Sequence, residues 1–134
     1  MNDHNLDKMS VQELVELFAK IGVAQGEAIE ESVIPPDDPS YQIAQDKFEK
    51  LFREMASIDR ELCRRGKTAR LALTQLYEHP DMQVKLKAAI HTLGVAPKEA
   101  RQVLQWIRDS GWPNQSLDAG MTIRNLDDGT FKPN

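Results

Sequence analysis

The stretch Leu76-Tyr-Glu-His-Pro-Asp-Met-Gln-Val-Lys-Leu-Lys-Ala-Ala-Ile-His-Thr-Leu93 decides the fold, because it reads as a helix, a tight turn and a second helix that is apolar on nearly every side. Proline is tolerated in the first turn of a helix, so the second helix is expected to begin near Pro80, with His79 as its N-cap. One face of this helix carries Val84, Ala88 and His91, and another carries Leu86, Ile90 and Leu93. A helix with two packing faces needs neighbours on both, which predicts a stacked helical array.

Length and composition indicate one globular domain. The chain has 134 residues, of which 40% are hydrophobic and 28% are charged. No apolar run approaches the ~20 residues that cross a bilayer. The N-terminal residues lack the pattern of a secretion signal, and a single cysteine excludes an internal disulfide. We therefore expect one cytoplasmic domain over residues 1–134, with residues 1–9 as a leader and 112–134 as a tail packed on the helices.

The net charge of minus four disfavours binding to nucleic acid, because such binding depends on neutralising phosphates. An acidic surface suits a basic protein partner better. The charge thus favours protein binding over nucleic-acid binding.

Capping and proline signals divide the rest of the chain into further helices. Ser10 and Glu13 have the spacing of a capping box, so a helix is expected to start there. Gly22 and Gly26 each weaken a helix by about 1 kcal/mol relative to alanine, so this helix is expected to bend or fray beyond Ile21.

Prolines over residues 34–40 end that first segment, and a long amphipathic helix is expected after them, with Asp38 as N-cap and Gly66 as C-cap. Helices over about 67–77, 80–93 and 97–110 complete a set of five. From residue 112 onward, glycine and proline predict an irregular tail, or at most a small hairpin at Asp128-Gly129. The apolar side chains expected to hold this tail on the helices are Trp112, Leu117, Met121, Ile123, Leu126 and Phe131.

Residues 70–107 resemble a HEAT-type helical repeat. The resemblance rests on Asp81, Val84-Lys85, Ala88-Ala89, Leu93-Gly94 and Pro97, with Lys85 standing where such repeats more commonly have arginine. The whole chain, including residues 118–121 and 125–129, is also similar to a small bacterial family of HEAT-like proteins that carries no established activity. This resemblance implies an all-α fold, with about five antiparallel helices in a short right-handed HEAT-like superhelix.

No catalytic, cofactor-binding or metal-binding constellation is predicted. His4 lies in the leader and is expected to have no role, and His79 is expected to cap a helix. His91 reads as a hydrogen-bonded core histidine, the alternative being a ligand. Cys63 reads as buried, although three nearby arginines leave open a reactive thiol.

The candidate binding residues come from an acidic run and from one aromatic and charged cluster. The carboxylates otherwise read as a solvated face, Trp106 is expected to be exposed and Trp112 to pack in the core. The six candidates are Trp106, Arg108, Asp109, Glu27, Glu30 and Glu31.

The leading hypothesis for function is a non-enzymatic protein-protein interaction module that needs no cofactor. Its concrete version is a bacterial immunity or antitoxin-like protein that binds a basic partner. One alternative is a DNA-binding or DNA-repair glycosylase of HEAT-like fold. Such enzymes use surface tryptophan, aspartate and arginine against DNA, and the only similar group here is Trp106, Arg108 and Asp109. Another is a self-associating structural protein.

Overall fold

The computed structural model describes residues 3–31 and 33–134, with residues 3 and 4 described by their backbone only. Helices account for all the regular structure in this part of the chain, which confirms the all-α class. In chain order they are η1 (Asp3–Lys8), α1 (Val11–Glu31), α2 (Tyr41–Arg65), α3 (Lys67–Leu71), η2 (Ala72–Glu78), α4 (Met82–Thr92), α5 (Pro97–Ser110) and α6 (Gln115–Asp127), where η marks a 3-10 helix. None of the described helices has the length and apolar character needed to cross a membrane.

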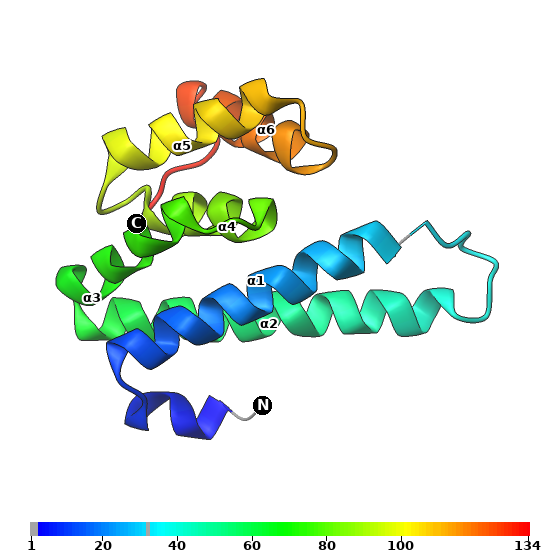
Figure 1. Cartoon of the computed structure of the whole chain (residues 1–134), viewed down its shortest axis with the longest axis horizontal. Coiled ribbons are helices and arrows are strands. Elements are labelled where there is room, and N and C mark those ends of the chain that lie inside the picture. Colours follow the sequence, from blue (N-terminus) through cyan, green and yellow to red (C-terminus); the bar gives the residue numbers. More distant parts are fainter. Residues whose placement is uncertain (1–2, 32) are drawn as a thin grey trace.

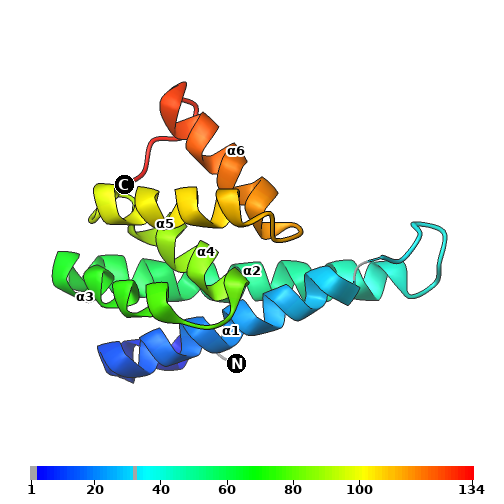
Figure 2. The same ribbon diagram turned by 45° about the horizontal axis from the view of Figure 1, so that its top comes forward.

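The helices form three layers. The long antiparallel pair α1 and α2 makes one outer layer, α4 lies against it, and α5 with α6 covers the other side of α4 (Figure 1). Figure 2 shows the same order from another direction, with α6 farthest from the α1–α2 pair. The helix that the sequence made central is therefore also the middle layer.

The two packing faces predicted for α4 are confirmed. Val84 and Ala88 belong to a core shared with α1, α2 and η2, whereas Leu86 and Leu93 belong to a second core shared with α5 and α6. All four side chains are buried. One helix thus joins two cores, which explains its apolar character on nearly every side.

The start of α4 differs from the prediction. The helix begins at Met82, and its N-cap is Asp81, whose Oδ1 accepts the backbone N–H of Val84 at 3.0 Å. The prediction that His79 caps this helix is therefore wrong. Instead, Nδ1 of His79 accepts the N–H of Asp81 at 3.0 Å and holds the turn before the helix. The prediction for His4 lies outside the described side chains.

The capping box at the start of α1 is confirmed, but the fraying beyond Ile21 is not. The Ser10 N–H donates to Glu13 Oε1 at 2.8 Å, and the Glu13 N–H donates to Ser10 Oγ at 3.1 Å. The helix then continues to Glu31. A Cβ at Gly22 would lie 2.9 Å from Cγ2 of Val84, so this glycine allows α4 to approach α1 closely rather than ending the helix.

The long second helix is confirmed, with a shifted start. Its N-cap is Ser40, and Asp38 instead accepts both the N–H and the hydroxyl of Ser40. Its predicted end at Gly66 is correct, since this glycine has φ 107° and donates its N–H to the last turn of α2. The leader also has structure, because Leu6 of η1 is buried and its carbonyl accepts from Arg65 Nη2 at 2.9 Å.

The prediction of an irregular tail or hairpin is wrong, because residues 115–127 form α6, the sixth α-helix in the part of the chain that the structure describes. Gln115, Ala119, Thr122 and Ile123 recur at helical spacing and are buried. Leu117 and Met121 face solvent instead of holding the tail. Gly120 suggested a break, yet an added Cβ there would touch only the Arg108 side chain at 3.6 Å, so the glycine sits inside an ordinary helix.

Candidate functional site

A cleft of about 190 Å³ opens between the second half of α1, the turn before α4 and the link from α5 to α6. We call it the acidic cleft and define it by Glu27, Glu30, Asp81 and Trp112. Its full lining is Val23, Gly26, Glu27, Glu30, Pro80, Asp81, Met82, Gln83, Trp112 and Gln115. Segments distant in the sequence meet here because α4 carries its N-terminus to α1 and the α5–α6 link returns the chain to the same place.

Three carboxylates and no lysine or arginine line the acidic cleft. Asp81 is engaged as the N-cap of α4, which leaves the Glu27 and Glu30 carboxylates to meet a ligand. The Trp112 side chain is 52% exposed, so the prediction that it packs in the core is wrong. Gly111 reverses the chain with φ 69°, and the link that follows leaves Trp112 at the mouth of the cleft. The cleft therefore combines negative charge with an accessible aromatic ring.

A chain of three buried amide groups, two of which line the acidic cleft, connects the helices around it. Nε2 of Gln115 donates to Oε1 of Gln83 at 2.9 Å, and Nε2 of Gln83 donates to Oε1 of Gln25 at 3.1 Å. All three side chains are buried. This amide relay ties α6 to α4 and α4 to α1, so the elements that build the cleft are fixed to one another.

Gln83 is also the first member of a polar row on α4, followed by Lys87 and His91 at four-residue spacing. Lys87 is buried, and its Nζ lies 4.6 Å from the ring centroid of Phe52 on α2. Burial lowers the pKa of the Lys87 ammonium, and the negative charge of Asp118 on α6 partly offsets this effect. The sequence reasoning missed this row, although polar residues at i, i+4 and i+8 of an otherwise apolar helix were the available signal.

His91 lies at the edge of the core, with its side chain 24% exposed and its ring next to a carboxylate. Its Nδ1 is 3.2 Å from Oδ1 of Asp59, and its ring meets Phe18 edge to face at 5.5 Å. A groove of about 320 Å³ runs past this pair, and Cys63 and Arg70 also line it. The residues at the end of the chain cover part of the groove, where Nη1 of Arg70 donates to the backbone oxygen of residue 134 at 2.7 Å.

Cys63 is exposed, so the prediction of a buried thiol is wrong. Partial burial of the sulfur and the nearby Asp59 carboxylate raise its pKa, although Arg70 acts in the opposite direction. A thiol with a raised pKa holds its proton near neutral pH, and the thiolate is the reactive form. Cys63, His91 and Asp59 thus share one groove, in which the Cys63 thiol has a raised pKa.

The other candidate binding residues do not join the acidic cleft. Glu31 points to α2, where its carboxylate is 3.8 Å from Nζ of Lys47. Trp106 is 56% exposed, as predicted, and lies in a different groove. Arg108 lies against Gly120 of α6 and bonds Asp109 at 3.1 Å. Trp106 and Arg108, two residues apart on a helix, point in nearly opposite directions, so these two members of the predicted cluster do not share one face of α5.

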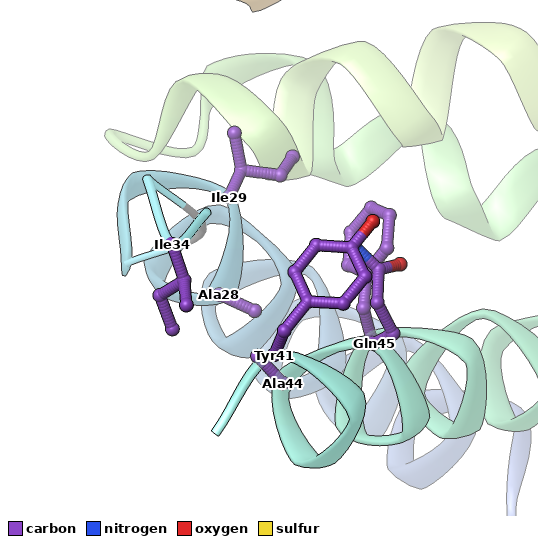
Figure 3. Close-up of a pocket in the computed structure, with 7 residues that line it drawn as sticks. Ala28, Ile29, Ile34, Tyr41, Ala44 and Gln45 are labelled. Atoms are coloured by element: carbon purple, nitrogen blue, oxygen red, sulfur yellow. The ribbon is translucent and has the colours of Figure 1, made fainter. Parts of the chain in front are cut away.

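The far end of the α1–α2 pair holds a smaller pocket of about 100 Å³. Figure 3 shows Ala28 and Ile29 of α1 and Ile34 of the link gathered with Tyr41, Ala44 and Gln45 of α2. Two apolar side chains that adjoin lining residues in sequence are strongly exposed: Val33 at 90% and Ile43 at 72%.

Within residues 5–31 and 33–134, histidine, cysteine, aspartate and glutamate side chains nowhere gather in threes that could hold a metal ion. Charged and aromatic side chains occur together in the acidic cleft and in the groove that contains Trp106.

Comparison with known proteins gives two results. Residues 12–127 match a protein family described as "Domain of unknown function (DUF2019)". The chain is also similar to a solved structure, the crystal structure of the protein RPA1889 from Rhodopseudomonas palustris CGA009, with 46% identity and a TM-score of 0.83. That similarity covers 96% of this chain and 98% of the other. No curated protein gives a significant match.

Proposed function

The chain belongs to this family of unknown function, and we propose from its own surface that it is a non-enzymatic module that binds a basic protein through the acidic cleft. The observation that carries the proposal is the meeting of Glu27 and Glu30 with an exposed Trp112 in one cleft that no lysine or arginine lines. Lysine and arginine side chains pair with carboxylates and pack on aromatic rings, and tryptophan is enriched among the residues that dominate interface energetics.

Two further features support binding of a basic partner. The amide relay fixes α1, α4 and α6 to one another, and a cleft that is fixed before binding loses little conformational freedom when a partner arrives. The net charge of minus four also favours encounter with a cationic partner through long-range attraction.

The concrete version of the proposal is a bacterial immunity or antitoxin-like protein, acting in the cytoplasm. Its supports are the small size, the acidity and the similarity to a bacterial protein of nearly equal extent. The HEAT-type superhelix belongs to the same proposal, because stacked helix pairs present extended surfaces to other proteins.

The test uses the purified product of the neighbouring gene, mixed with this chain and run on size exclusion. We expect a complex with the wild type and its loss with the double variant Glu27→Gln and Glu30→Gln. Glu31→Gln is the matched control, since it removes the same charge from the same helix outside the cleft. Absence of a complex with the wild type contradicts the immunity version. An equal loss of the complex in the double variant and in the Glu31→Gln control contradicts binding through the acidic cleft.

Self-association is a second candidate, favoured by the exposure of Val33 and Ile43, which adjoin in sequence two residues that line the pocket of Figure 3. Light scattering at high concentration distinguishes it, because a dimer that Ile43→Glu dissociates would support this candidate and a monomer would exclude it. The DNA-repair alternative finds no comparable support, since Trp106 and Arg108 lie on different sides of α5. A gel shift at low salt tests that alternative directly.

A further inference from the structure

A second cleft, which we call the Trp106 groove, has the chemistry of a site for a positively charged side chain. It lies between η2, α4 and α5 and encloses about 490 Å³. Its lining is Tyr77, Glu78, Lys85, Glu99, Gln102, Val103 and Trp106. Residues of three helices thus meet here, away from the residues that define the acidic cleft.

The groove already holds one cation that belongs to the chain itself. Nζ of Lys85 lies 5.4 Å from the centroid of the Trp106 ring and donates a hydrogen bond of 2.9 Å to the backbone oxygen of Tyr77. This arrangement shows that the indole ring and a nearby carbonyl oxygen accommodate a positive charge in this groove. An indole has two faces, and Trp106 remains 56% exposed with Lys85 in place.

The Trp106 groove is lined by two carboxylates and one ammonium group, so its net charge is negative. Glu78 and Glu99 line it, and among the described residues neither carboxylate has an ion pair or a hydrogen bond to a side chain. Glu99 acts electrostatically on the Tyr77 phenol, whose pKa is raised chiefly by burial and further by this carboxylate. Glu99 therefore lies close enough to Tyr77 to act on its phenol, while its own side chain is exposed to solvent.

We propose that the Trp106 groove binds an arginine side chain of the basic partner, with the guanidinium stacked on the free face of Trp106 and paired with Glu99. The inference rests on the proposed function in taking the ligand from a protein partner. A guanidinium suits this geometry better than an ammonium, because it is planar, stacks on aromatic rings and presents a fork of N–H donors to a carboxylate. The ammonium group of Lys85 already lies over one face of the Trp106 ring, which leaves the other face for the ligand.

The test uses three synthetic peptides that differ at one position: acetyl-Gly-Arg-Gly-amide, its lysine analogue and its uncharged citrulline analogue. The chain has two tryptophans, so its ¹⁵N-labelled form gives two indole N–H signals, assigned with the variants Trp106→Phe and Trp112→Phe. We expect the arginine peptide to shift the Trp106 signal saturably, with an affinity several-fold above that of the lysine peptide and no response to the citrulline peptide.

Two substitutions separate this groove from the acidic cleft. Glu99→Gln is expected to weaken the response of the Trp106 signal several-fold, whereas Glu27→Gln leaves it unchanged. Lys85→Met, which removes the internal cation, is expected to strengthen it. Both tryptophans are exposed, so replacing them is not expected to unfold the chain. The dispersion of the backbone amide signals checks that each variant is folded.

An equal response to the arginine and lysine peptides overturns the assignment of a guanidinium. Equal effects of Glu99→Gln and Glu27→Gln also overturn the proposal, because they indicate attraction to overall negative charge. A shift of the Trp112 signal alone supports the acidic cleft while refuting the groove. A shift of the Trp106 signal alone does the reverse, so the failures of the two proposals are distinguishable.

Discussion

The amide relay under the acidic cleft makes a quantitative prediction about stability. Replacing Gln83 with methionine keeps an unbranched side chain of similar length but removes both amide groups. Oε1 of Gln25 and Nε2 of Gln115 then lose their partners inside the protein, where both side chains are buried. A buried polar group left without a partner costs about 1–3 kcal/mol, so two such groups cost about 2–6 kcal/mol.

Burial of the methionine side chain offsets about 1.5–3 kcal/mol of this loss. The expected net destabilisation by Gln83→Met is therefore about 2 kcal/mol. This is a large fraction of the free energy of unfolding of a small domain, which is about 5–15 kcal/mol. The triple variant with methionine at Gln25, Gln83 and Gln115 leaves none of the relay amides orphaned. It should be destabilised less than the single variant, although it removes more hydrogen bonds.

Urea unfolding measures both variants, with stability taken from the midpoint at constant slope. Gln75→Met, at an exposed position, is the control and should change stability by less than about 0.5 kcal/mol. A Gln83→Met variant as stable as this control would refute the reasoning. So would a triple variant whose loss equals the sum of the losses of its three single variants, because orphaned partners would then not be the cause.

Two further predictions concern glycine packing and acid. Gly22→Ala should destabilise the protein by about 1–3 kcal/mol in urea unfolding, because the added Cβ would lie 2.9 Å from Val84 Cγ2. Gly120→Ala should instead stabilise the protein by about 0.5–1 kcal/mol, because the nearest atom to its added Cβ is 3.6 Å away. Equal effects of the two substitutions would contradict this reasoning. Hydrogen bonds from Arg64 and the next arginine lower the pKa of Glu61 from 4.5 to about 2. Ionised Glu61 therefore stabilises the folded state fully above pH 4.5, and this contribution is lost as the pH falls through about 2. The Glu61→Gln variant should accordingly lose less stability than the wild type across that range. Urea midpoints measured against pH check this, and identical pH dependences would exclude it.

Local sequence signals determined the helical class and several helix boundaries. The capping box at Ser10 and Glu13 and the stop at Gly66 depend on backbone groups within one or two turns, so neighbouring residues sufficed to predict them. The two faces of α4 also followed from periodicity alone, because a helix fixes the directions of its side chains. The carboxylates of Glu27 and Glu30 were likewise identified from sequence as candidate binding residues, without their partner Trp112.

Tertiary packing decided the remaining features, because each depends on residues far apart in the chain. Gly22 reads as a weak point in a helix until Val84 is placed against it, and Gly120 reads as a break until α6 packs on α5. Trp112 reads as a core residue until the α5–α6 link carries it to the mouth of the acidic cleft. Sequence periodicity tells which side of a helix is buried, but only the assembled layers tell what covers that side and which charges meet at its edge.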